Sequence, residues 1–184
     1  FGMFILIFAV WLIQILSSNI NLKIIIPIVL SFILVFLLCF FTLEHVNFRI
    51  MNFFFSEIGD NYQISKSLDS FESGGLFGKG IGEGTIAKNL PDVHSDFIFA
   101  LIGEELGGLF AILIVVLYIL IYLRIHIISQ RSNNFFIVTS LTGLANIFIF
   151  QVIINISSSL NIIPTKGMTL PFISYGGSSL VSSS

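Results

Sequence analysis

The sequence predicts an all-α polytopic membrane protein, a helical bundle with one large extracytoplasmic loop. Hydrophobic residues make up 55% of the 184 residues and charged residues only 10%, and the mean hydropathy is +1.02. Soluble domains carry about a quarter charged residues, because their surfaces face water. The surplus of apolar side chains here indicates a surface that faces lipid, where helices satisfy their own backbone groups.

Five apolar segments make up the predicted bundle. A membrane-spanning helix needs about 20 mostly apolar residues. The second segment holds no charged residue and tolerates Pro27 near its start, and the third is long enough to cross with tilt. Because the chain begins and ends inside apolar stretches, we expect a piece of a longer membrane protein that is inactive by itself. About four full spans and the start of a fifth are predicted, at residues 3–16, 24–43, 97–128, 135–156 and, truncated, 172–184.

The connections between these segments differ in charge. The short connections 17–23 and 129–134 are flanked by basic residues only, whereas 44–96 carries eight of the ten acidic residues. Positive charge beside a span marks the cytoplasmic side. We therefore expect the segments 44–96 and 157–171 to be extracytoplasmic loops. No basic patch suggests a nucleic-acid partner.

A glycine-rich stretch, Gly78-Lys79-Gly80-Ile81-Gly82-Glu83-Gly84, interrupts the long loop. A nucleotide-binding fingerprint would need a preceding strand and a following helix in a parallel α/β unit, and this context offers neither. A tightly turned loop is the simpler interpretation. The backbone N–H groups of Gly78, Gly80 and Gly82 are nevertheless candidates for holding a substrate phosphate.

Asp96 stands where the polar loop ends and an apolar helix begins, in the stretch Leu90-Pro91-Asp92-Val93-His94-Ser95-Asp96-Phe97-Ile98-Phe99. One interpretation is a helix N-cap, a position that aspartate favours. The other is a carboxylate base at the membrane surface, acting on a lipid-borne substrate with His94 and Ser95 beside it. Metal binding by Asp92, His94 and Asp96 has no distinctive spacing, so we predict no chain-held metal.

Two pairs of polar residues interrupt the predicted spans. Glu104 and Glu105 lie in the third, and Glu104 would lie about 12 Å along the helix from Asp96. A charge at that depth is costly and indicates either function or a structural ion pair. Gln151 and Asn155 share one face of the fourth span, and interhelical hydrogen bonds are the ordinary interpretation for both and for Asn146 in the same span.

The last connection is irregular, with two prolines, glycines and several hydroxyl residues between Ile163 and Ser179. Such backbone at membrane depth needs protein or water around it. Lys166 is the only cation there and could meet a diphosphate as a point charge. The candidate substrate-binding residues of this connection are Thr165, Lys166, Ser174, Gly176 and Gly177.

Several of these stretches together resemble the SEDS family, which comprises FtsW, RodA and SpoVE. The resemblance is carried in order by Gly74-Gly75-Leu76-Phe77-Gly78, by the Asp96 stretch, by Gly103-Glu104-Glu105-Leu106-Gly107 and by residues 164–179. The lysine in Pro164-Thr165-Lys166-Gly167 resembles the FtsW branch rather than RodA. The family implies a ten-span protein of the bacterial inner membrane, and its essential acid falls on Asp96, with Ser95 replacing the usual threonine.

The resemblance also implies an activity. Family members polymerise lipid II into peptidoglycan glycan strands, with a class B penicillin-binding protein and other membrane proteins of the division machinery as partners. Asp96 would be the general base, Glu104 and Glu105 would support the site, and a divalent cation such as Mg²⁺ would be a cofactor if one takes part. The alternatives are a lipid II flippase and a non-catalytic division scaffold.

Overall fold

The computed structural model describes residues 2–17, 22–42, 61–90, 93–163 and 168–175. All regular elements within these ranges are helices and no strand occurs among them, which confirms the predicted all-α class. The elements, in chain order, are α1 (Gly2–Ser17), α2 (Leu22–Thr42), α4 (Asn61–Gly74), the 3₁₀ helix η1 (Ala87–Asn89), α5 (Ile98–Glu105), α6 (Gly108–Gln130) and α7 (Phe135–Ser159).

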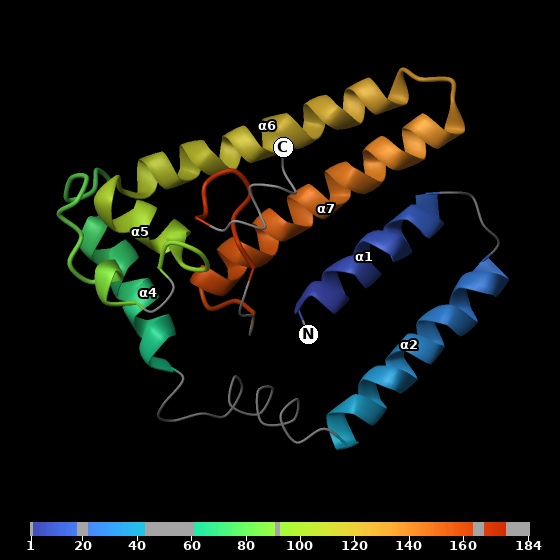
Figure 1. Cartoon of the computed structure of the whole chain (residues 1–184), viewed down its shortest axis with the longest axis horizontal. Helices are drawn as coiled ribbons and strands as arrows, with labels where there is room; N and C mark the ends of the chain where they lie inside the picture. The colour runs from blue at the N-terminus through green and yellow to red at the C-terminus, as the bar shows by residue number, and fades with distance from the viewer. Residues whose placement is uncertain (1, 18–21, 43–60, 91–92, 164–167, 176–184) are drawn as a thin grey trace.

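Helices α6 and α7 form a long antiparallel hairpin, with α6 along one edge of the molecule (Figure 1). They have 23 and 25 residues and are both long and apolar enough to cross a membrane. At 1.5 Å per residue, 23 residues extend about 35 Å, which exceeds the hydrocarbon thickness of about 30 Å. Many of their large apolar side chains are exposed, including Ile112, Leu120 and Leu144. Such a surface suits lipid rather than water.

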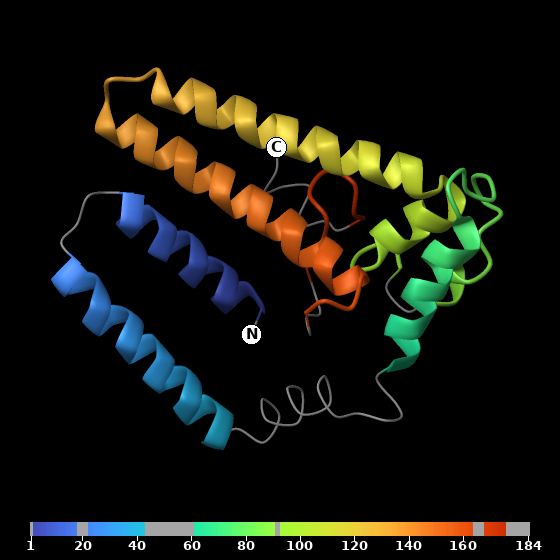
Figure 2. The ribbon, with the colours of Figure 1, turned by 180° about the vertical axis from the view of Figure 1, so that it is seen from behind.

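Helices α1 and α2 flank the hairpin on the side of α7 (Figure 2). Leu6 and Val10 of α1 are buried in a cluster with Ile154 of α7 and Met168. Helix α2 lies beyond α1, and the rings of Phe8 and Phe32 stack between the two helices. Their described apolar segments are shorter than those of the hairpin. Which side of the membrane each connection faces remains a prediction.

The predicted span 97–128 is wrong as a single helix, because the chain breaks after α5 and restarts at Gly108. A break leaves the end carbonyls of one helix and the first N–H groups of the next without intrahelical partners. The glycine loop, residues 74–84, supplies both sets. Its Lys79 and Gly80 N–H groups donate to the carbonyls of Glu104 and Glu105, while the carbonyls of 75 and 76 accept from the N–H groups of 108 and 109.

Close backbone contact makes this arrangement depend on glycine. Gly78 and Gly107 have φ angles of 77° and 86°, a region that L side chains rarely adopt. A Cβ on Gly107 would also collide with the backbone of Gly78 and Leu76. Residues 74–90 are therefore a fitted part of the fold rather than a loose extracytoplasmic connection, packed with α4 and α5 at the end of the hairpin opposite to the α6–α7 turn (Figure 1).

Candidate functional site

Asp96 lies in a turn, residues 93–97, that leads into α5. Val93 and Phe97 are buried in a cluster with Ala87, Leu90 and Ala100. This cluster holds the two ends of the turn while His94 is exposed and the residues 95 and 96 are partly exposed. The N-cap of α5 is Phe97, with no side-chain hydrogen bond. The alternative interpretation of Asp96 as a helix N-cap is therefore wrong.

Three consecutive carbonyls of this turn accept hydrogen bonds from distant parts of the chain. The carbonyl of His94 accepts from the Tyr175 N–H at 2.8 Å, and that of Ser95 accepts from the Ser174 hydroxyl at 2.6 Å. The Asp96 carbonyl accepts from the Asn155 carboxamide Nδ2 at 3.0 Å. Each backbone carbonyl of residues 94–96 is thus held by a hydrogen bond from α7 or from residues 168–175, which we call the C-terminal loop.

The C-terminal loop is itself held against the hairpin. Asn155 Nδ2 donates to the Met168 carbonyl at 2.6 Å, Gln151 Nε2 donates to the Thr169 carbonyl at 2.9 Å, and the Tyr118 hydroxyl donates to the Pro171 carbonyl at 2.5 Å. Leu170 between them is completely buried. Side chains of α6 and α7 therefore satisfy the irregular backbone that the sequence predicts at membrane depth.

The predicted interhelical hydrogen bond is observed for Asn146, whose Oδ1 accepts from the Tyr122 hydroxyl of α6 at 3.2 Å. It is wrong for Gln151 and Asn155, whose carboxamides donate to loop carbonyls instead. Their shared face was visible in the sequence, but the identity of their partners was not. Asn155 is 1% exposed, and its Oδ1 has no hydrogen-bond partner among the described residues. An unpaired buried acceptor costs about 1–3 kcal/mol. Asn155 is the principal site residue that sequence reasoning missed.

Ser174 also differs from its predicted role in binding substrate. Its hydroxyl is buried, with the residue 2% exposed. The oxygen accepts from the Leu170 N–H at 2.7 Å and donates its proton to Ser95. Ser174 therefore organises the turn beneath Asp96 and has no free proton for a substrate.

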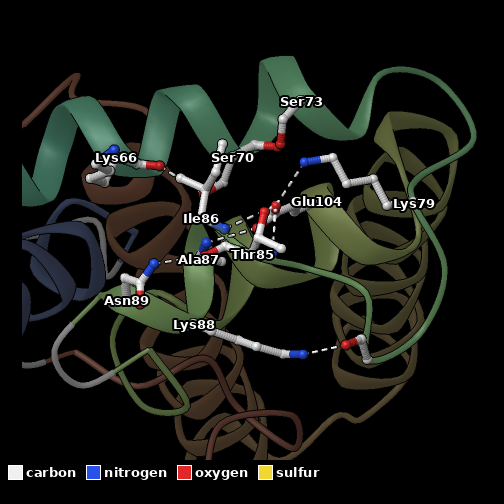
Figure 3. Close-up of polar contacts among 11 residues, drawn as sticks. Lys66, Ser70, Ser73, Lys79, Thr85, Ile86, Ala87, Lys88, Asn89 and Glu104 are labelled. Atoms are coloured by element: carbon white, nitrogen blue, oxygen red, sulfur yellow. Dashed lines mark hydrogen bonds and ion pairs between the residues drawn. The ribbon is translucent and has the colours of Figure 1, made fainter.

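Glu104 contacts Lys79 and the three residues 85–87 (Figure 3). Its side chain is fully buried, and Oε1 meets the Lys79 ammonium at 3.1 Å. Oε1 also accepts from the N–H groups of Thr85 and Ile86 at 2.9 and 3.1 Å, and Oε2 accepts from Ala87 at 2.7 Å. Of the two interpretations that the sequence left open, the structural ion pair is the observed one.

Burial by itself would raise the pKa of Glu104, but the hydrogen bonds from Ala87, Ile86 and Thr85 and from Lys79 outweigh it. Together they lower the pKa from 4.5 to about 2, because each donor favours the ionised carboxylate. Glu104 is therefore an anion at neutral pH, and it holds the segment 85–87 that precedes the Asp96 turn. Its neighbour Glu105 is partly exposed and meets the glycine loop through its carbonyl.

The prediction that the backbone N–H groups of three glycines hold a substrate phosphate is contradicted for two of them, Gly78 and Gly80. The Gly78 N–H donates to the carbonyl of Gly74 at 2.8 Å, and the Gly80 N–H donates to the carbonyl of Glu105 at 2.9 Å. Because each backbone N–H carries one proton, an N–H that already donates to a carbonyl is not available to a phosphate. Gly82 is exposed, and its carbonyl accepts from the Lys88 ammonium.

The remaining candidates of the last connection lie outside the described residues. For the described part of the chain, no three His, Cys, Asp or Glu side chains gather as they would around a metal ion. Substrate binding therefore stays a prediction for Thr165, Lys166, Gly176 and Gly177. The participation of a divalent cation also stays a prediction.

Comparison of the sequence with known proteins agrees with the family resemblance that the sequence motifs indicate. Two curated proteins, each named "Probable peptidoglycan glycosyltransferase FtsW", are similar to this chain: one from Caulobacter vibrioides is 39% identical over 142 residues, and one from Coxiella burnetii is 45% identical over 130 residues. These matches cover 77% and 68% of the chain. The chain spans only about a third of the relatives' length, 36% and 35% respectively.

A solved structure shares the fold. This structure is described as "Structural coordination of polymerization and crosslinking by a peptidoglycan synthase complex". It aligns with this chain with a TM-score of 0.65 at 23% sequence identity. The alignment covers 87% of this chain and 45% of the other. The family model described as "Cell cycle protein", FtsW/RodA/SpoVE, matches residues 1–184. The resemblance is confirmed, and the chain belongs to the FtsW, RodA and SpoVE family of cell cycle proteins.

Proposed function

We propose that the protein containing this chain is a peptidoglycan glycosyltransferase that polymerises lipid II into glycan strands during cell division. Family membership and the names of the similar proteins support a cell-wall glycosyltransferase. The observation that carries the proposal for this chain is the Asp96 turn. Its carbonyls are fixed by three hydrogen bonds, while Asp96 itself stays partly exposed at one end of a hairpin of membrane length.

In the proposed reaction Asp96 is the general base. It takes the proton of the 4-hydroxyl of the acceptor's N-acetylglucosamine, and that oxygen attacks the anomeric carbon of the donor's N-acetylmuramic acid. The bond to undecaprenyl diphosphate breaks, and the configuration at the anomeric carbon inverts. A positioned base contributes about 10²–10⁴-fold to such a rate. The fixed backbone of the turn supports this role, because a base must stay within hydrogen-bond reach of its proton.

The leaving diphosphate needs positive charge near it. Lys79 is paired with Glu104, so we assign this task to Lys166, with Thr165, Gly176 and Gly177 beside it. A divalent cation such as Mg²⁺ would neutralise the diphosphate further. Magnesium is often held by one or two carboxylates and by substrate phosphates, and the described residues offer no chain-held cluster. In this proposal the ion would bind chiefly through the phosphates of the substrate.

The proposed setting is the bacterial inner membrane, which the protein crosses several times. A class B penicillin-binding protein is the proposed partner, together with other membrane proteins of the division machinery. The fold shared with a chain of a peptidoglycan synthase complex supports this pairing.

The test is polymerisation of lipid II by the whole protein, purified in detergent with its partner. Asp96→Asn is expected to lower the rate by about 10²–10⁴-fold. The matched control is Asp69→Asn, the same change on an exposed acid of α4, which should leave the rate within about twofold because surface changes are mild.

Three results would overturn the proposal. A folded Asp96→Asn variant that polymerises at the normal rate rules out Asp96 as the base. A wild-type protein that moves lipid II across vesicles but makes no polymer in detergent is a flippase. Partner binding with neither polymerisation nor transport identifies a scaffold.

A further inference from the structure

Asn155 joins two segments that lie far apart in the sequence. It lies four residues before the end of α7, and its Nδ2 donates to the Asp96 carbonyl at 3.0 Å and to the Met168 carbonyl at 2.6 Å. A carboxamide nitrogen carries two protons, so both are used. The Asp96 turn and the C-terminal loop thus meet on one side chain.

The helical turn that carries Asn155 is itself fixed. The Ser159 hydroxyl donates to the Asn155 carbonyl at 3.0 Å, and the Ser67 hydroxyl of α4 donates to the Ser159 carbonyl at 2.7 Å. All three residues are at most 1% exposed. Asn155 is therefore an immobile support for whatever its carboxamide holds.

The unpaired Oδ1 of Asn155 shows which half of the carboxamide matters. A leucine would fill nearly the same space without burying an acceptor that has no partner. Buried polar groups without partners are rare because they are costly. The hydrogen bonds from the two N–H donors offset the cost of burying the carboxamide oxygen. One of these bonds goes to the carbonyl of Asp96.

We propose that Asn155 is a positioning residue for Asp96. Its carboxamide fixes the Asp96 peptide relative to the C-terminal loop, so that the carboxylate keeps a constant distance to the acceptor hydroxyl. This inference rests on the proposed function. A displacement of about 1 Å at a reacting group costs about 10²-fold in rate, whereas binding of a large substrate depends on many other contacts.

Gln151 provides a matched control. It lies one helical turn before Asn155 and uses the same chemistry on the same loop, donating to the Thr169 carbonyl at 2.9 Å. The Gln151 carboxamide nitrogen bonds Thr169 of the loop and not the Asp96 turn. Comparing Asn155→Leu with Gln151→Met therefore separates positioning of Asp96 from simple attachment of the loop.

The experiment measures kcat and KM for lipid II polymerisation by the whole protein with its partner, after gel filtration and thermal unfolding have shown that each variant is folded. Asn155→Leu is expected to lower kcat by about 10²-fold with little change in KM. Gln151→Met is expected to lower kcat by less than about fivefold. If Asn155→Leu does not fold, the smaller Asn155→Ala removes the same donors without burying a charge and carries the same expectation.

A second comparison uses the Asp96→Asn background. Residues that act as a unit are non-additive, so Asn155→Leu should lower the residual rate of Asp96→Asn no further. Equal losses in the Asn155 and Gln151 variants, a rise in KM at constant kcat, or multiplicative losses in the double variant would each overturn the inference. Failure of the wild type to polymerise would instead refute the proposed function.

Discussion

Glu104 shows how one buried carboxylate can organise a loop. The segment 85–87 carries no charge that could hold it in place, but its three N–H groups converge on Glu104 (Figure 3). A carboxylate that accepts several N–H bonds is strongly favoured in its ionised form. The loop is therefore tied to α5 by charge as well as by packing.

This connection predicts a pH dependence of stability. The pKa of Glu104 is lowered from 4.5 to about 2, so its contribution is fully present above pH 4.5 and is lost as the pH falls towards 2. The shift corresponds to about 3 kcal/mol. Thermal unfolding in detergent between pH 6 and pH 2.5 should show a fall in Tm that is clearly smaller in Glu104→Gln.

Lys79→Met is the control for that measurement. The Lys79 side chain is 34% exposed, and solvent-exposed ion pairs contribute only about 0–1 kcal/mol. This variant keeps the three backbone donors and should therefore keep most of the acid sensitivity. An acid-induced fall that is the same in Glu104→Gln and in the wild type would contradict the assignment.

The residues of the site differed in how far the sequence could predict them. Asp96 was a candidate from the sequence because its neighbours form a recognisable stretch, and its role as a base stays a prediction. Asn155 was not, because its role depends on a contact with Asp96 that spans 59 residues. The sequence likewise merged Glu104 into one long span, since hydropathy cannot detect a helix that ends at residue 105.

At the scale of elements, the central feature is the break between α5 and α6. The glycine loop supplies partners to both helix ends, so the break keeps its backbone hydrogen bonds. The only sequence signal was the pair Gly107-Gly108 inside an apolar run. Hydropathy merges the two helices because both are apolar, and the compensating hydrogen bonds come from residues about 30 positions earlier.

The break predicts unequal costs for two similar substitutions. Gly107→Ala combines a φ of 86° with a collision against the backbone of Gly78 and Leu76, and it should cost more than about 3 kcal/mol. Gly75→Ala has a φ of 57° in open space and should cost about 1 kcal/mol. Denaturation in mixed micelles measures both, and equal losses would show that the contact with the glycine loop is unimportant.

At the scale of the whole molecule, the hairpin separates two ends. The glycine loop and the Asp96 turn lie at one end and the connection after Arg131 at the other (Figure 1). A hairpin about 35 Å long that crosses the bilayer puts these ends on opposite sides. The basic residues Arg124 and Arg131 favour the cytoplasm for the second end.

Cysteine labelling tests that orientation. In a Cys39→Ala background, Glu83→Cys and Asn133→Cys place single thiols at exposed positions of the two ends. A membrane-impermeant maleimide should label Glu83→Cys in intact spheroplasts and Asn133→Cys only after permeabilisation. Labelling of both from outside, or the reverse pattern, would contradict the predicted topology.

The three hydrogen bonds beneath Asp96 also have a consequence for biosynthesis. Ser95 and Ser174 are 79 residues apart in the chain, and the helices α6 and α7 lie between them. At a translation rate of about 5–20 residues per second, the turn waits about 4–16 s for its last partner. These three carbonyls can therefore be bonded only after the hairpin has left the ribosome, and until then the nascent chain holds the turn through its apolar cluster alone.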